Sequence, residues 1–154
     1  MLRGVLIGAA VAVALMAATA AFAQMAPYGS ADDAKAMLAK AVAELKANKA
    51  EALAKFNKAD GEFKDRDLYV YCFEVTTGKF TAHVNPRLMG TDIRAVKDPK
   101  DGSPLGQKLY DAAKEGTVTT VDYYFPRPFG TEPLPKEAYV TRVNGQGCGV
   151  GYYK

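Results

Sequence analysis

The sequence predicts an α+β fold in which a long helix packs on one face of a five-stranded antiparallel sheet. Two observations lead to this prediction. Apolar residues recur at helical spacing over residues 31–57, whereas from residue 68 onward the chain consists of short segments rich in aromatic and β-branched residues. The segment order, which is helix, two strands, a loop with a second helix, and three strands, suits a sheet with one face covered by the long helix.

The long helix is predicted from about Ala31 to about Asn57. Ser30 and Asp33 have the spacing of a capping box at its start, and Gly61 follows its end. Its apolar stripe is narrow, so the helix must lie on another layer of the protein.

The remaining elements follow from strand-type composition and from turn residues. Ser103 as the N-cap and Pro104 as the first helical residue predict the second helix, over residues 104–115. The five strands are predicted at residues 68–75, 80–84, 117–125, 136–143 and 147–153, with Asn144-Gly145 as the turn between the last two.

The first 23 residues have the pattern of a cleavable secretory signal peptide. Arg3 precedes an apolar run from Val5 to Ala20, and Ala21-Phe22-Ala23 predicts cleavage before Gln24. The alternative is a retained membrane anchor, although the run is short and alanine-rich for a span. We therefore expect one domain, residues 24–154, in the periplasm or secreted.

Composition argues against several classes of function. The net charge is only +3 and the basic residues are dispersed, which gives no indication of a nucleic-acid partner. A single histidine, His83, cannot by itself build a multi-histidine metal site, and the lack of a Cys-x-x-Cys motif predicts no haem attachment. No nucleophile–base arrangement is evident, so we predict no catalytic residue, no cofactor and no enzyme.

The two cysteines, Cys72 and Cys148, are predicted to form a disulfide, because an oxidising compartment favours one; two buried free thiols are the alternative. The bond would place the first and last strands side by side. Because side chains alternate along strands, one face would then carry Leu68, Val70, Cys72, Cys148, Val150 and Tyr152 toward the long helix. The opposite face would carry Tyr69, Tyr71, Phe73, Gly147, Gly149 and Gly151.

Large rings opposite a row of glycines leave room for a small ligand pocket. The alternative is that the rings form an ordinary core and the glycines permit close backbone approach. His83 is either a structural residue or a hydrogen-bonding group, and Lys136 is either solvated or a cation for a carboxylate.

Several segments together resemble the second type of single Cache domain. Their order and spacing cover nearly the whole mature chain: GEFKDRDLYV (61–70), AHVN (82–85) with LMGTD (88–92), DPKDG (98–102), VDYYFP (121–126), KEAYV (136–140) and GVGYY (149–153). Thr120 and Phe125 stand where tryptophan is common in that family, and Val84 stands where proline is usual.

This resemblance implies a PAS-like sheet in an extracytoplasmic sensor module that binds small molecules, often short carboxylates. By matched position the ligand-binding candidates are Tyr69, Tyr71, His83, Tyr123, Phe125 and Lys136, with Lys136 neutralising the carboxylate. Such a module would pass its signal to a membrane receptor, kinase or transporter. The alternatives are an interaction protein whose pocket is filled by side chains, and a haem or metal carrier that uses His83 with Met89.

Overall fold

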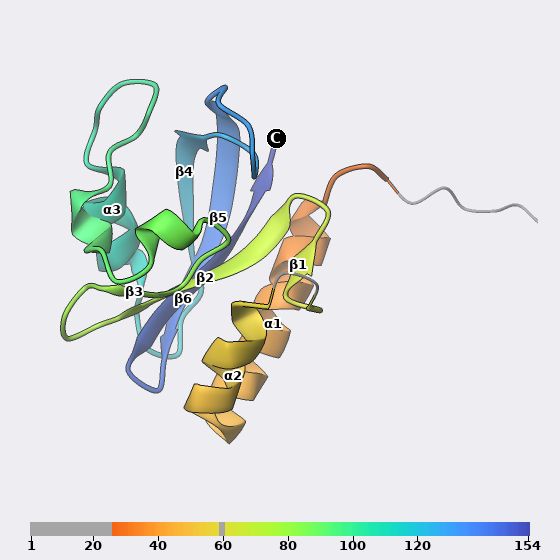
Figure 1. The fold of residues 1–154 in the computed structure, drawn as a ribbon, viewed down its shortest axis with the longest axis vertical. Helices are drawn as coiled ribbons and strands as arrows, with labels where there is room; N and C mark the ends of the chain where they lie inside the picture. Colours follow the sequence, from red (N-terminus) through yellow and green to blue (C-terminus); the bar gives the residue numbers. More distant parts are fainter. Residues whose placement is uncertain (1–25, 59–60) are drawn as a thin grey trace, which may run out of the picture.

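The computed structural model describes residues 26–58 and 61–154, so the predicted signal peptide lies outside the described residues. Figure 1 shows a central sheet with two helices on one face and a third helix on the other. Within the described ranges, none of the helices combines the length and the apolar composition that a membrane crossing requires.

The predicted long helix is two helices, α1 (Ala31–Ala47) and α2 (Lys49–Phe56). Asn48 separates them, because its extended backbone ends α1 while its side chain accepts a hydrogen bond from the backbone N–H of Glu51 and caps α2. The predicted capping box of Ser30 and Asp33 is present. Both helices bury apolar residues against the sheet: Ala34, Met37, Leu38, Ala41, Leu45, Ala52 and Phe56.

The sheet is antiparallel with the order β1-β2-β6-β5-β4, and β3 pairs with β2. The five predicted strands are present, and a two-residue strand precedes them. Their bounds are β1 Lys64–Asp65, β2 Leu68–Glu74, β3 Phe80–Ala82, β4 Thr119–Phe125, β5 Leu134–Val143 and β6 Gln146–Tyr153. The predicted α+β, PAS-like architecture is therefore confirmed.

The predicted disulfide between Cys72 and Cys148 is present. The two cysteines are register partners on β2 and β6, the first and last of the five predicted strands. Their neighbours Val70 and Val150 also pair and pack in the cluster formed with α1 and α2. The predicted assignment of residues to the helix-covered face is correct.

The opposite face is covered by α3 (Leu105–Ala112) and by two short 3₁₀ helices, η1 (Pro86–Leu88) and η2 (Ile93–Ala95). The predicted cap at Ser103 is wrong. Pro104 is the N-cap of α3, and no side-chain hydrogen bond caps the helix. The backbone of Ser103 belongs instead to the preceding turn, where its N–H donates to Asp101 and its carbonyl accepts from Asp98.

Candidate ligand-binding site

The glycines of β6 form a floor on which larger side chains lie directly. A Cβ atom added to Gly149 would lie 2.4 Å from Oη of Tyr71, and one on Gly151 would lie 2.7 Å from Cε of Lys136. Phe73 covers Gly147 in the same way. Much of the room expected above the glycines is therefore filled by the side chains themselves, as the packing alternative predicted.

A small cavity nevertheless remains between this floor and the covering helices. Its volume is about 30 Å³, which is room for about two water molecules. It is lined by Tyr69, Tyr71, Phe80, His83, Leu88, Ile93, Val96, Leu105, Leu109, Tyr123 and Phe125. The structure thus brings five of the six predicted site residues to one cavity wall.

The sixth, Lys136, does not line this cavity; it is buried behind the rings of Tyr69 and Phe125, with 2 % of its surface exposed. Its Nζ donates to Oη of Tyr69 and to Oη of Tyr153, both at 3.2 Å. The same nitrogen lies 4.4 Å and 4.5 Å from the centroids of these two rings. None of the ion pairs in the described part of the chain includes Lys136.

Burial lowers the pKa of Lys136 from 10.5 to about 7, because the charged ammonium loses its hydration. The negative charge of Asp67 acts in the opposite direction and raises this pKa. Tyrosine oxygens and ring faces compensate a cation less well than a carboxylate does. The site therefore holds a lysine whose pKa lies near neutral pH.

Three tyrosine hydroxyls face this region in their neutral form. Burial raises the pKa of Tyr69, Tyr71 and Tyr123 above the usual value of 10. A Cβ on Gly151 would lie 3.1 Å from Oη of Tyr123, so this hydroxyl and the Lys136 side chain both lie over Gly151. The tyrosines act as neutral hydrogen-bonding groups throughout the physiological pH range.

His83 directly follows β3 and is half-buried at the cavity wall. Its Nδ1 accepts a hydrogen bond from the backbone N–H of Asn85 at 2.9 Å, so the neutral ring carries its proton on Nε2. Burial and the nearby charge of Lys136 lower the pKa of His83 to about 3. His83 is therefore neutral at physiological pH and can donate through Nε2.

A wider groove of about 270 Å³ lies beside the cavity. Tyr69, His83 and Phe125 line both spaces and form the wall between them. The other walls of the groove are residues 84–87 and the loop 126–130, where Phe129 is 96 % exposed.

Asp67 joins the start of α1 to the loop that borders the groove. Its carboxylate accepts from the backbone N–H of Gly29 at 2.8 Å and from Nε of Arg127 at 3.0 Å. The Arg127 guanidinium also lies over the rings of Tyr28 and Tyr153, at 4.0 Å and 4.7 Å from their centroids. These partners bury Asp67, although it lies in a run of charged residues.

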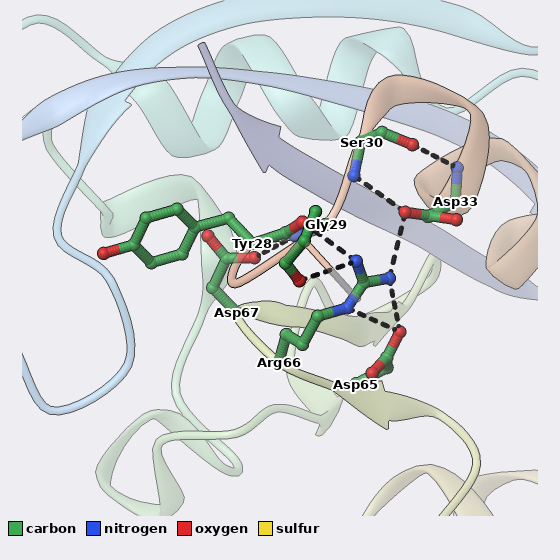
Figure 2. A network of polar contacts seen from close by, with 8 residues as sticks. Tyr28, Gly29, Ser30, Asp33, Asp65, Arg66 and Asp67 are labelled. Atoms are coloured by element: carbon green, nitrogen blue, oxygen red, sulfur yellow. Dashed lines mark hydrogen bonds and ion pairs between the residues drawn. The ribbon is translucent and has the colours of Figure 1, made fainter. Parts of the chain in front are cut away.

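Figure 2 shows the neighbouring contacts of Arg66, which fix the same segment. The Arg66 guanidinium donates to the carbonyl of Tyr28 at 2.9 Å, to Asp33 at 2.9 Å and to Asp65 at 2.7 Å. Arg66 therefore ties the first turn of α1 to the turn between β1 and β2.

Comparison with known proteins gives consistent results. A family model described as single Cache domain 2 matches residues 9–153. The methyl-accepting chemotaxis protein McpP of Pseudomonas putida is 26% identical over 87 residues, which is 56% of this chain and 16% of McpP. The chain thus spans about a sixth of the length of this curated relative.

Solved structures resemble the chain over most of its length. One is a Cache chemosensory domain described for its recognition of carboxylic acids; it is 25% identical with a TM-score of 0.60, and the match covers 79% of this chain and 86% of that one. A periplasmic sensor domain of a chemotaxis protein is also 25% identical, with a TM-score of 0.58 and coverages of 79% and 88%. A methyl-accepting chemotaxis protein from Vibrio parahaemolyticus shares the fold at 22% identity, with a TM-score of 0.63 and coverages of 79% and 86%.

Proposed function

This chain belongs to the single Cache domain 2 family, and we propose that it binds a short carboxylate in the aromatic cavity and passes the signal to a membrane partner. It is a Cache sensor domain homologous to the periplasmic domains of chemotaxis receptors. The observation that supports the ligand class is Lys136, a buried cation without an anionic partner among the described residues.

Burying the charge of Lys136 has a free-energy cost. A buried ammonium that is not paired is unfavourable, and the depressed pKa of Lys136 expresses this cost. A carboxylate placed against Nζ would restore full ionisation through a charge-assisted hydrogen bond in a desolvated site. An anion that pairs with Lys136 removes this unfavourable free energy, and the relief contributes to its binding affinity.

The surroundings limit the ligand to a small one. The cavity has room for about two waters, and its remaining walls are apolar or aromatic. Tyr69, Tyr123 and Nε2–H of His83 supply neutral hydrogen-bonding groups around the anion. Phe125 covers the outer side, and its ring centroid lies 5.8 Å from Nζ of Lys136.

Signal transfer to a membrane protein is part of the same proposal. A domain of residues 24–154, exported after removal of residues 1–23, would present its bound state to a receptor, kinase or transporter in the membrane. The carboxylic acid recognition described for one structural neighbour supports this ligand class. The alternative is an interaction protein whose cavity holds no ligand.

The test is a thermal-shift and calorimetric titration of the purified protein with formate, acetate, propionate and butyrate. A ligand at 100 times its dissociation constant adds about 2.7 kcal/mol to stability, which raises Tm by several degrees. We expect Lys136→Met to abolish the shift, while Lys40→Met, which replaces an exposed lysine on α1, preserves it. Failure of every acid to bind at millimolar concentration would favour the interaction-protein alternative.

A further inference from the structure

We propose that the outer surface around His83 binds an acidic segment of a partner protein, and that an aromatic or aliphatic side chain of this segment packs on Phe129. The surface consists of two adjoining grooves, and we call it the His83 surface. The inference goes beyond the proposed function, because it needs no carboxylate in the cavity and names the chemistry of a protein partner.

The His83 surface has room for a short stretch of chain. One groove is the space of about 270 Å³ between residues 84–87 and the loop 126–130. The other, of about 490 Å³, lies between residues 56–58 at the end of α2 and the segment that follows β3. The two grooves adjoin, because they share the wall residues Tyr69, His83, Val84 and Pro86. Hollows of this size accept a small molecule or a few residues of a partner.

The charged side chains that line the His83 surface are all basic. Arg87 and Arg127 line one groove, and Lys58 and Lys64 line the other. Among the described residues, neither lining contains an aspartate or a glutamate. Arg127 is paired with Asp67. The other three cations take part in none of the ion pairs found in residues 26–58 and 61–154.

Two other hollows of the protein have mixed charges. The groove beside α1 contains Glu115 together with lysines and an arginine, and a pocket near the C-terminus contains Asp98, Asp101 and Asp122 together with lysines. Clefts lined by charges of one sign concentrate their electric field and favour a partner of the opposite charge. The His83 surface therefore favours an acidic partner.

Phe129 adds an apolar contact at the rim of this surface. Its side chain is 96 % exposed, and its backbone φ of 64° lies in the left-handed region. A bulky residue is rare in this conformation, which glycine and asparagine adopt at lower cost. In the free protein the ring lies 5.6 Å from Nζ of Lys64, an exposed contact that contributes little. A partner, by contrast, would gain a large apolar surface from it.

A chain segment suits these features better than a membrane or a single small anion. The cations line concave walls, which the flat surface of a bilayer does not enter. They are also divided between two grooves, so one small anion meets only some of them. In an extended segment, side chains on one side repeat every ~7 Å, so successive carboxylates can pair with cations of both grooves.

The experiment measures binding of a fluorescent random copolymer of glutamate and tyrosine to the purified protein by fluorescence polarisation. Polyglutamate tests charge alone, and a copolymer of lysine and tyrosine reverses the charge. We expect the glutamate–tyrosine copolymer to bind at least about tenfold more tightly than polyglutamate, because its rings pack on Phe129. The lysine–tyrosine copolymer should not bind.

Charge reversal tests the grooves directly. Lys64→Glu combined with Arg87→Glu should weaken copolymer binding at least about tenfold. Lys40→Glu combined with Lys49→Glu is the matched control, because it changes the net charge equally at exposed positions of α1 and α2 outside both grooves, and it should keep the wild-type affinity.

Three outcomes would overturn this inference: no binding of the glutamate–tyrosine copolymer, equal losses in the groove variant and its control, or binding to phosphatidylglycerol vesicles in place of the copolymer. The last would identify a membrane contact. Lys136→Met should bind the copolymer like the wild type, so failure of the carboxylate site and failure of the His83 surface are separate results.

Phe129→Asn supplies an independent measurement. It should bind the glutamate–tyrosine copolymer no more tightly than polyglutamate, yet unfold at the wild-type temperature or higher, because asparagine tolerates the left-handed conformation. A Tm lowered by several degrees would mean that Phe129 stabilises the free protein, which contradicts its role as a contact for a partner.

Discussion

The two faces of the sheet contain different kinds of buried group. On the face toward α1 and α2, buried polar side chains find partners; Gln146, for example, accepts from Thr81 and donates to Glu74. On the cavity face, Lys136 forms no ion pair and the Tyr71 hydroxyl has no hydrogen-bond partner among the described residues. Polar groups of the first face are paired within the protein, whereas Lys136 of the second is the group that we propose pairs with a ligand.

If the proposal is correct, this difference assigns stability to one face of the sheet and ligand binding to the other. The helix-covered face contributes a cystine and a continuous apolar cluster. The cavity face retains buried polar groups without partners, which lower the stability of the fold. Such a loss of stability is common at binding sites. The two faces share the β2 and β6 backbones, and adjacent residues of a strand point to opposite faces. Substitutions at adjacent positions therefore affect different faces.

The largest expected effect concerns the helix-covered face. Replacement of both Cys72 and Cys148 by alanine opens a link across 76 residues and should lower the free energy of unfolding by about 4–5 kcal/mol. Urea denaturation measures this loss. Ligand affinity, measured well below the lower Tm, should change little, and a large loss of affinity would contradict the independence of the two faces.

The next effect is a gain of stability on the cavity face. Lys136→Met removes a buried charge, so the ligand-free protein should be roughly 2–4 kcal/mol more stable at pH 7. Between pH 7 and 10.5 the unfolded lysine holds a proton that the folded one has lost, so this residue makes the wild type more stable as pH rises. The wild-type disadvantage should therefore shrink across that window and disappear above it.

Urea denaturation of both proteins at pH 6, 8 and 10 tests this prediction, and the difference between the curves isolates Lys136 from other titrating groups. A variant that is less stable than the wild type at pH 7 would show that the buried ammonium stabilises the empty site.

A smaller effect is expected from the floor of the cavity. In Gly149→Ala the new methyl group would overlap the phenol of Tyr71, and the displacement should cost about 2 kcal/mol of stability and weaken ligand binding. Gly130→Ala is the comparison: its added Cβ would lie 3.2 Å from the backbone oxygen of Arg127, a tight contact without overlap, so its loss of stability should be smaller. Equal stability of the two variants would mean that Tyr71 is free to move.

The smallest effect, counted per pH unit, is a pH dependence of affinity. Because a carboxylate binds the charged form of Lys136, binding above pH 7 requires proton uptake, and affinity should fall about tenfold per pH unit there. His83, whose pKa is about 3, should add no inflection near pH 6.5. Titrations from pH 6 to 9 in buffers of different ionisation enthalpy measure both quantities; a constant affinity up to pH 9 would contradict the pKa of Lys136.

The sequence was sufficient for the sheet and its two faces, because strand alternation and the Cys72–Cys148 pair determine which side chains share a face. The same alternation places Tyr153, two residues after Gly151, on the cavity face. Tyr153 is a hydrogen-bond partner of Lys136 that was not predicted. The break at Asn48 was also missed, since the surrounding alanines and lysines favour helix; the signal was Asn48 with Glu51 three residues later.

Other features depended on contacts between distant parts of the chain. The burial of Asp67 is one of them, because its neighbours in sequence are charged and its ionic partner, Arg127, lies 60 residues away. Likewise, the row of glycines did not reveal how much of the space above it the tyrosine rings fill. Local patterns specify the faces, but side-chain partners across the fold determine the remaining cavity.

The carboxylate of Asp67 has one further consequence. Its two oxygens are divided between the backbone just before α1 and the arginine of the loop at the groove, and its charge also acts on Lys136. A ligand that moves Arg127 would thus alter, through a single side chain, both the electric field in the cavity and the anchoring of the first helix. Information about occupancy could then reach the surface of the domain over a path of two hydrogen bonds, without any rearrangement of its apolar interior.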